Sequence, residues 1–428
     1  MLNSLIPYLL KLKLRFPGLY IRLVALGKRY LGSYMGIYPR PLANEISAVT
    51  AVIRGSQWNM AYGKGLVHER LESDFAEYIG VGHAIAVNTG GMALQMSMRA
   101  LGLKPGHEVI MQADTCSATA FATMNAGCTP IFSDISEKTF MLSEPDLRSH
   151  INSSTGAVIA THMWGNPEDM ETVSRVAAEH NIFVIEDACL SLGAIAQGRN
   201  AGATGHVGVF SFGCVKPIQG GEGGMIVTND EALARELRSM RHWGDRTIEF
   251  GERDAVQLSW NGRMSEIVAA LVREQLKGYP KHLAELREAV MEFKQYIDQI
   301  EGLEIVSGAS SDLCQSAFTQ VVLRLDEKAL GWKKIALKDE LYSRGIQSWH
   351  ANFEPINSLT FFREDKWKEW VVKGDMQRIG ENYHHRFSVV EKVYQTQGMG
   401  LGKMNFLSSS NRRYLRKQID ALLSKKSA

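Results

Sequence analysis

The sequence predicts an α/β protein, with a mostly parallel central sheet in a large domain and a smaller C-terminal α+β domain. Between residues 71 and 229, short apolar runs alternate with helical stretches. Several of these runs are almost continuously apolar, as expected for strands buried on both faces of a parallel sheet. Near Pro280 the pattern changes to one long charged helical stretch. Such a change predicts a second, smaller domain.

The elements of the large domain alternate in chain order. The predicted strands are residues 84–88, 108–113, 129–134, 156–164, 182–188, 207–212 and 223–229. Helical periodicity marks residues 90–103, 169–180 and 231–243. Because helices separate the strands, parallel pairing is expected.

The C-terminal part begins with the charged helix 282–300. Short strands at 303–307 and 317–325 follow, and a basic amphipathic helix, 412–426, closes the chain. We therefore divide the chain into an N-terminal extension (1–41), a large domain (42–280) and a small domain (281–428).

Composition excludes several function classes. The 428 residues carry a formal net charge of only +2, which gives no general field for nucleic acid. The five cysteines are scattered and form no CxxC pair. This predicts neither a disulfide framework nor a metal site, and it favours a reducing, cytoplasmic location.

The N-terminal extension is basic and apolar. It has seven lysines and arginines and no acidic residue before Glu45, and Pro17-Gly18 interrupts its apolar runs. These breaks exclude a bilayer-spanning helix. We expect a helix packed on the body or across a dimer; contact with a membrane surface or a partner is the alternative.

Chemically active residues gather where the predicted parallel strands end, which is where ligands bind in such sheets. Asp187 ends one strand, and Ser211 and Lys216 follow another. His162 and Trp164 lie at the end of a third strand. A fourth strand is followed by Thr89-Gly90-Gly91-Met92, a helix start that contains two glycines.

Each of these features has a simple chemical use. A helix start with glycines can bind phosphate through its backbone N–H groups. A buried carboxylate needs a positive partner, such as a pyridinium nitrogen or an arginine. A lysine beside flexible backbone can form a Schiff base with an aldehyde. Each feature alone is ordinary structure, but in this order they describe a pyridoxal phosphate site.

The chain resembles the sugar aminotransferases of the DegT/DnrJ/EryC1/StrS family, which have the fold of type-I pyridoxal phosphate (PLP) enzymes. The segments that carry the resemblance are EVIMQADTCSATAFATMNAGCTPIFSDI, THMWGNPEDM, FVIEDACLSLGA, GVFSFGCVKPIQGGEGGMIVTND and WNGRMSEIVAALVREQL. The spacing SFxxxKxIxxGEGG is specific for this family. The resemblance extends from about residue 42 to the C-terminus.

The resemblance implies roles for individual residues. Lys216 corresponds to the lysine that carries the cofactor as a Schiff base and moves protons, and Asp187 to the partner of the pyridinium nitrogen. Ser211 and the helix start at Gly90, Gly91 and Met92 correspond to phosphate ligands. Asn261 corresponds to an asparagine that reaches the phosphate from a neighbouring subunit, which implies a homodimer with shared sites.

Three cofactor-contact positions depart from the family pattern. Cys116 stands where an aromatic ring usually stacks on the pyridine, and Leu190 where a glutamine lies near the phenolic oxygen. Gly90-Gly91 replaces a Gly-Thr pair, which removes one hydroxyl. We therefore expect either weaker cofactor binding or an altered reaction.

Substrate contacts are assigned less directly. Phe353-Glu354-Pro355 resembles a substrate loop of some family members. Candidates for the substrate pocket are His162, Trp164, Arg263, Trp349, His350 and Glu354. For His162 and Trp164 plain packing is an equal alternative. For Arg263, and for Arg241, the alternative is a structural ion pair.

The resemblance implies an aminotransferase that moves an amino group from L-glutamate or L-glutamine to a ketone. The acceptor is expected to be a keto-sugar, a nucleotide-linked keto-sugar or a ketocyclitol. One alternative is a PLP-dependent lyase or dehydratase of the aminohydroxybenzoate-synthase type. Another is a catalytically idle regulatory relative, against which the intact Lys216, Asp187 and Ser211 argue.

Overall fold

The computed structural model describes residues 43–56, 58, 66–245, 254–255, 257–308, 315–351, 353–371 and 373–424. The expected N-terminal extension, 1–41, lies outside the described residues. Within the described ranges, no helix is both long and apolar enough to cross a membrane.

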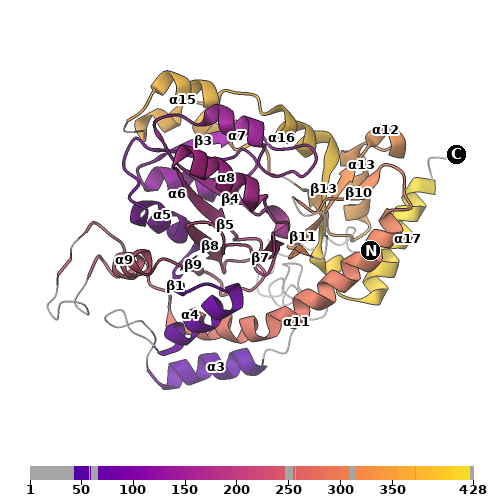
Figure 1. The fold of residues 1–428 in the computed structure, drawn as a ribbon. Helices are drawn as coiled ribbons and strands as arrows, with labels where there is room; N and C mark the ends of the chain where they lie inside the picture. Colours follow the sequence, from indigo (N-terminus) through magenta and orange to yellow (C-terminus); the bar gives the residue numbers. More distant parts are fainter. Residues whose placement is uncertain are drawn as a thin grey trace, which may run out of the picture.

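The described part of the chain forms a seven-stranded central sheet in the order β1-β9-β8-β5-β4-β2-β3 (Figure 1). The strands are β1 His83–Val87, β2 Glu108–Gln112, β3 Thr129–Ser133, β4 Thr155–Thr161, β5 Phe183–Asp187, β8 Val207–Ser211 and β9 Gly224–Thr228. Neighbours pair in parallel except where β9 is one of the two strands. The predicted fold class is therefore confirmed.

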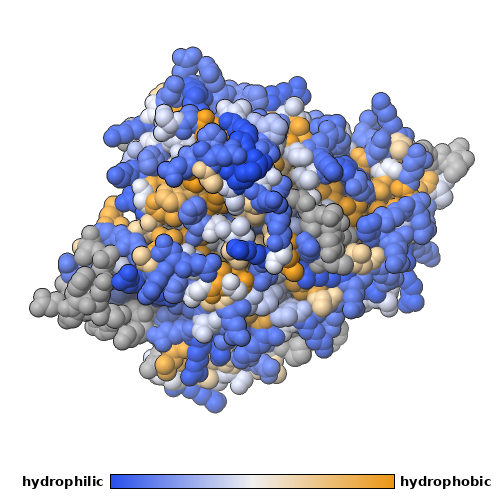
Figure 2. Space-filling model, viewed as in Figure 1, coloured by the Kyte–Doolittle hydropathy of each residue, from blue (hydrophilic) through white to orange (hydrophobic). Residues whose placement is uncertain are grey.

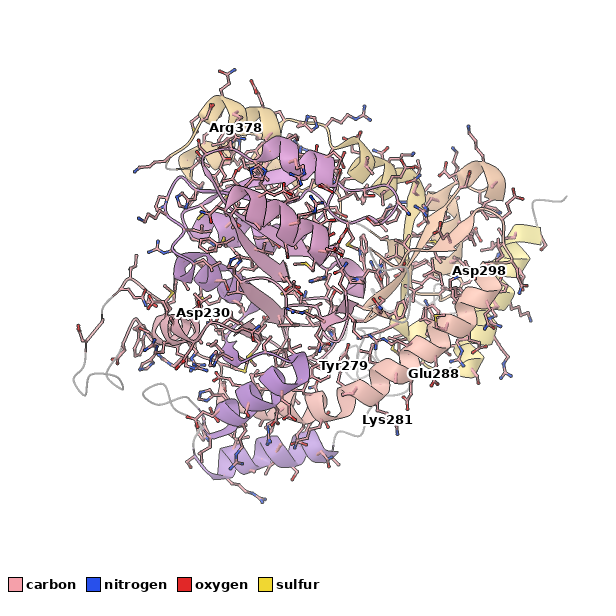
Figure 3. All side chains as sticks on the ribbon, in the orientation of Figure 1. Asp230, Tyr279, Lys281, Glu288, Asp298 and Arg378 are labelled. Atoms are coloured by element: carbon pink, nitrogen blue, oxygen red, sulfur yellow. The ribbon has the colours of Figure 1, made fainter. Side chains whose placement is uncertain are left out.

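Helices surround this sheet, and local sequence signals set their ends. The helices are α3 Ala43–Arg54, α4 Leu66–Ile79, α5 Gly90–Ala100, α6 Ser117–Asn125, α7 Glu144–His150, α8 Met170–His180 and α9 Glu231–Arg241. Asp169 accepts the Thr172 N–H at 3.1 Å and begins α8, and Asn181, with a φ of 54°, ends it. Asp230 begins α9 in the same way (Figure 3).

Both faces of the sheet are buried, as the continuous apolar runs predicted. On β1, Ile85 and Val87 join a core cluster that includes side chains of α5, α6, α8 and α9. The alternate residues Ala84 and Ala86 join a second cluster with side chains of α4 and of the long helix α11, Glu266–Ile297. Successive side chains of a strand point to opposite faces, so one apolar run serves both clusters.

Helix α11 connects the large and small domains (Figure 1). Its first half packs on the large domain, where the Tyr279 hydroxyl donates to the Leu192 carbonyl at 2.7 Å. Its second half packs on the small domain, and Lys281 and Glu288 lie on its exposed side (Figure 3). The boundary expected at residue 280 falls within this continuous helix, which contains Pro280.

The small domain is built on an antiparallel sheet in the order β10-β11-β13-β12. Its strands are β10 Leu303–Ile305, β11 Gln320–Leu325, β12 Ser348–His350 and β13 Gly398–Gly402. Val321, Leu323 and Leu401 face a core that includes side chains of α12 Glu327–Leu330, α13 Lys334–Ser343 and α17 Ser409–Leu423. Val322 belongs instead to the core of the large domain, so this sheet has a helix side and a side facing the large domain.

One segment of the C-terminal part returns to the large domain. It contains α14 Thr360–Arg363, α15 Met376–Tyr383 and α16 Ser388–Lys392. The Phe362 ring packs edge to face on Phe132 of β3, and the Tyr383 ring packs on Phe132 at a tilt. The Asn382 side chain accepts the Phe132 N–H and donates to the Phe132 carbonyl, each at 2.9 Å. The segment therefore covers the edge strand, whose backbone groups are otherwise open to pairing.

Candidate active site

Asp187 ends β5 and is only 6% exposed. Its Oδ1 accepts the Cys189 N–H at 3.1 Å, and its Oδ2 accepts the Thr119 hydroxyl at 3.3 Å. Within the described residues, no lysine, arginine or histidine lies within ion-pair distance of this carboxylate. A buried carboxylate held only by neutral donors is well suited to a cationic ligand.

Lys216 lies on the loop between β8 and β9. The loop is closed by hydrogen bonds from Phe212 N to Gly223 O, 2.9 Å, and from Gly220 N to Phe212 O, 2.8 Å. Val215, next to the lysine, has a φ of 73°. A β-branched residue is strained in this left-handed region, and such strain gathers at functional sites.

The charges of both the lysine and the aspartate act on the thiol of Cys189. Burial raises the pKa of its thiol, the Asp187 charge raises it further, and the Lys216 charge opposes the increase. Asp187 and Lys216 therefore lie within electrostatic reach of one thiol. The sequence placed Asp187 at the end of one strand and Lys216 soon after another, and in the structure the charges of both residues act on Cys189.

The start of α5 lies against these residues. The Thr89 hydroxyl caps the helix by accepting the Met92 N–H at 3.0 Å, so this predicted phosphate donor bonds Thr89 in the structure. A Cβ added to Gly90 would lie 2.8 Å from the Ser211 Cβ and 3.2 Å from the Cys189 Sγ. Gly90, Ser211 and Cys189 therefore meet at the carboxyl ends of β1, β8 and β5.

Replacing Gly90 with alanine is expected to lower PLP affinity at least tenfold, because a methyl group there displaces the Ser211 side chain. Gly91→Ala is the matched control, since a Cβ at Gly91 lies 3.9 Å from its nearest neighbour, Thr89 Oγ1. Equilibrium dialysis of PLP with both variants measures the effect. Equal affinities in the two variants would show that the close approach at Gly90 has no role in binding.

The comparisons with known proteins agree with this geometry. The model of the DegT/DnrJ/EryC1/StrS aminotransferase family matches residues 41–374. This chain belongs to that family. It is thus a PLP-dependent aminotransferase, as the resemblance implied.

Two curated relatives and one solved structure illustrate the similarity. GDP-perosamine synthase of Caulobacter vibrioides is 34% identical over 305 residues, 71% of this chain and 80% of that protein. UDP-N-acetyl-3-dehydro-alpha-D-glucosamine 3-aminotransferase of Acidithiobacillus ferrooxidans is 31% identical over 288 residues, 67% and 74% of the two chains. An aminotransferase structure from Psychrobacter cryohalolentis superposes with a TM-score of 0.78 at 24% identity, covering 91% and 99%.

The described residues fit the PLP of this family. Asp187 would pair with the ring nitrogen, Ser211 and the start of α5 would surround the phosphate, and Lys216 would hold the aldehyde carbon. When bound, PLP supplies an electron sink for the substrate carbon. A side chain at Gly90 would displace Ser211 and Cys189 within this site.

Two of the three departures from the aminotransferase family pattern, Cys116 and Leu190, flank this site. Cys116 is exposed at the start of α6 and makes no capping hydrogen bond with its side chain. Leu190 is half-buried against the core of the sheet, and its carbonyl accepts the hydroxyl of Thr319 from the small domain. The small domain therefore contacts the edge of the site at Leu190.

Asn261 lies beside the phosphate end of the site within its own chain. Its carbonyl accepts the Asn88 side-chain amide at 3.2 Å, and the neighbouring Gly262 carbonyl accepts the Asn88 N–H at 2.9 Å. Asn88 directly precedes Thr89, the cap of α5. The expected contact of Asn261 with a second subunit stays a prediction.

His162 and Trp164 lie in the interior of the protein. The His162 Nδ1 accepts the Glu168 N–H, so its Nε2 carries the proton and donates to Glu186 at 2.9 Å. Burial raises the pKa of Glu168 to about 7. The Trp164 indole donates to the Ala351 carbonyl of the small domain at 2.5 Å. Their positions favour packing over substrate contact.

The two arginine candidates differ in their surroundings. Arg241 is buried and paired with Glu72, and it also donates to the Ala86 carbonyl at 3.1 Å, so it is structural. Arg263 is half-buried and pairs by backbone with Val87 at the end of β1. Its guanidinium lies 4.1 Å from the Trp243 ring centre, and burial followed by the Arg241 charge lowers its pKa. It stays a candidate for binding a substrate anion.

The substrate candidates of the small domain fall on different sides of its sheet. His350 pairs with Met399, faces the helix side and bonds Lys334 of α13 at 2.9 Å, so it is not brought to the site. Trp349 faces the opposite side, toward the large domain. Glu354 is exposed. Its segment lies beside the end of β2, because Ile356 N donates to Ala113 O at 2.7 Å.

Sequence reasoning missed Thr119 and Cys189. Cys189 could have been found, because it lies two residues after Asp187, where a backbone N–H can return to the carboxylate. Thr119 gave no local signal, since it lies 68 residues from Asp187.

Proposed function

We propose that this enzyme transfers an amino group from L-glutamate or L-glutamine to a ketone of a nucleotide-linked sugar, in the biosynthesis of an amino sugar. The observation that carries the proposal is the meeting of Lys216, Asp187 and the glycine-lined start of α5 at one edge of the sheet. The relatives named above, one for a GDP-sugar and one for a UDP-sugar, supply the acceptor class.

In this proposal Lys216 provides the chemistry of proton transfer. Lys216 would hold the cofactor between turnovers, and once the amine of the donor has taken its place, the free Lys216 amine would take the proton from the donor carbon. In the second half of the reaction it returns a proton to the carbon of the acceptor. The two substrates therefore use the same lysine in turn, which gives ping-pong kinetics.

A homodimer with shared sites belongs to the proposal. Large apolar side chains are exposed around the site and the nearby ends of α3, α4 and α9, namely Trp58, Leu66, Val215, Trp243 and Leu258. Apolar residues are also exposed between polar ones on the face in Figure 2. A second copy would cover the exposed residues beside Asn261. Light scattering should give twice the mass of one chain.

We also propose a cytoplasmic location for the enzyme.

The experiment that tests the function follows the visible spectrum of the PLP-loaded enzyme. L-glutamate or L-glutamine should convert the yellow cofactor band to that of pyridoxamine phosphate. A nucleotide-linked keto-sugar should then restore the yellow band, and mass spectrometry should find the aminated sugar. A spectrum that neither amino acid changes would contradict the assignment of the donor.

A further inference from the structure

Three buried threonine hydroxyls form a chain that ends on Asp187. Thr119 Oγ1 donates to Asp187 Oδ2 at 3.3 Å. Thr115 Oγ1 lies 3.4 Å from Thr119 Oγ1 and 3.5 Å from Thr161 Oγ1. Thr115, Thr119 and Thr161 are 2%, 1% and 4% exposed. Water therefore has little access to these hydroxyls.

The direction of this chain follows from counting protons. Each threonine hydroxyl has one proton to donate. Thr119 uses its proton on Asp187, so the contact with Thr115 requires Thr115 to donate. Thr115 must in turn accept from Thr161. All three O–H dipoles then point toward the carboxylate, and hydrogen bonds in such a chain strengthen one another.

The chain connects three elements that are distant in sequence. Thr161 ends β4 and lies opposite Asp187 in the parallel register of β4 and β5. Thr119 is in the first turn of α6, and Thr115 precedes that helix. The other carboxylate oxygen, Oδ1, accepts the Cys189 N–H. Both oxygens are thus held, and each still has a lone pair for a ligand.

We propose that Thr119, supported by Thr115 and Thr161, is a positioning residue that fixes the Asp187 carboxylate to face the PLP ring nitrogen. The last torsion of an aspartate side chain is soft, so without such bonds the carboxylate can turn. This inference rests on PLP binding in the orientation assigned above. It goes beyond that assignment because it concerns a residue that acts through Asp187.

The test compares Thr119→Val with Thr119→Ser and Thr123→Val. Valine keeps the shape of threonine and removes the hydroxyl, whereas serine keeps the hydroxyl. Thr123 is the matched control because it is buried on the same helix and donates to the Thr119 carbonyl at 3.0 Å, not to Asp187. Each variant is loaded with PLP, its dissociation constant is measured by dialysis, and its yellow band is titrated with pH.

Thr119→Val is expected to weaken PLP binding about tenfold and to move the midpoint of the pH titration, since it removes a bond to a charged group. Thr119→Ser and Thr123→Val should keep both values near those of the wild type. If Thr119→Val does not fold, Thr115→Val should show a smaller change in the same direction.

Wild-type affinity and titration in Thr119→Val would overturn the proposal and leave the chain with a packing role only. Equal losses in Thr119→Val and Thr123→Val would also overturn it. A wild-type protein that binds PLP and transfers no amino group would instead contradict the proposed function. The affinities of the variants can still be compared in that case.

Discussion

Replacing Lys216 with alanine is expected to lower kcat on the order of 10⁴-fold, because the proton transfers of both half-reactions lose their catalyst. The yellow band of the lysine-bound cofactor should disappear at the same time. The fold should persist, because the hydrogen bonds that Lys216 makes with the described residues use its backbone, which alanine also has. The Lys216 N–H donates to Gly213 O at 3.4 Å, and the Lys216 carbonyl accepts from the Gln219 side chain at 3.2 Å.

The measurement is single-turnover conversion by the amino donor, together with the spectrum. Lys277→Ala is a suitable control, because Lys277 is an exposed lysine of α11 that pairs with Glu274. It should leave both the spectrum and the rate unchanged. A Lys216→Ala protein that stays yellow and transfers amino groups at the wild-type rate would refute the assignment of this lysine.

Replacing Asp187 with asparagine is expected to lower kcat about 10²- to 10³-fold, because asparagine has no charge to hold the proton on the cofactor ring. Without cofactor, the thermal midpoint of the variant should equal or exceed that of the wild type. The reason is that the carboxylate is buried with neutral donors only, so its removal relieves a desolvation cost.

Glu186→Gln provides the contrast, one residue away on the opposite face of β5. Glu186 accepts bonds from His162, Gly202, Thr204 and Gly205. Burial raises the pKa of Glu186, but the hydrogen bonds from His162 and from the backbone N–H groups of Gly202 and Gly205 outweigh burial and lower it. We expect Glu186→Gln to cost about 1.5–3 kcal/mol of folding free energy and to leave kcat near the wild-type value.

The pH dependence of that difference follows from the direction of the shift. A lowered folded-state pKa gives stability above the pKa of the unfolded chain, and this stability is lost as the pH falls through the folded value. The wild type should therefore exceed Glu186→Gln in stability at neutral pH and lose that advantage in acid. If Asp187→Asn unfolded while Glu186→Gln lost kcat, Asp187 would be the structural residue and Glu186 the catalytic one, which would contradict these assignments.

The sequence by itself determined the strands and the residues at their ends. Apolar runs such as 182–188 and 207–212 are long enough for one strand each, and their polar ends mark Asp187 and Ser211. Because the carboxyl ends of parallel strands share one edge, the meeting of Asp187, Ser211 and Lys216 could be foreseen before the order of the strands was known.

Only the tertiary structure decided which side chains support that site. Thr119 reaches Asp187 because β5, β4 and β2 are neighbours in the sheet, and no local pattern gives that order. His162 lies inside because its Nε2–H donates a hydrogen bond to Glu186 on the next strand. His350 turns from the site because its register on β13 places it on the helix side. Strand order, register and partners far along the chain are set by packing of the whole molecule, not by local periodicity.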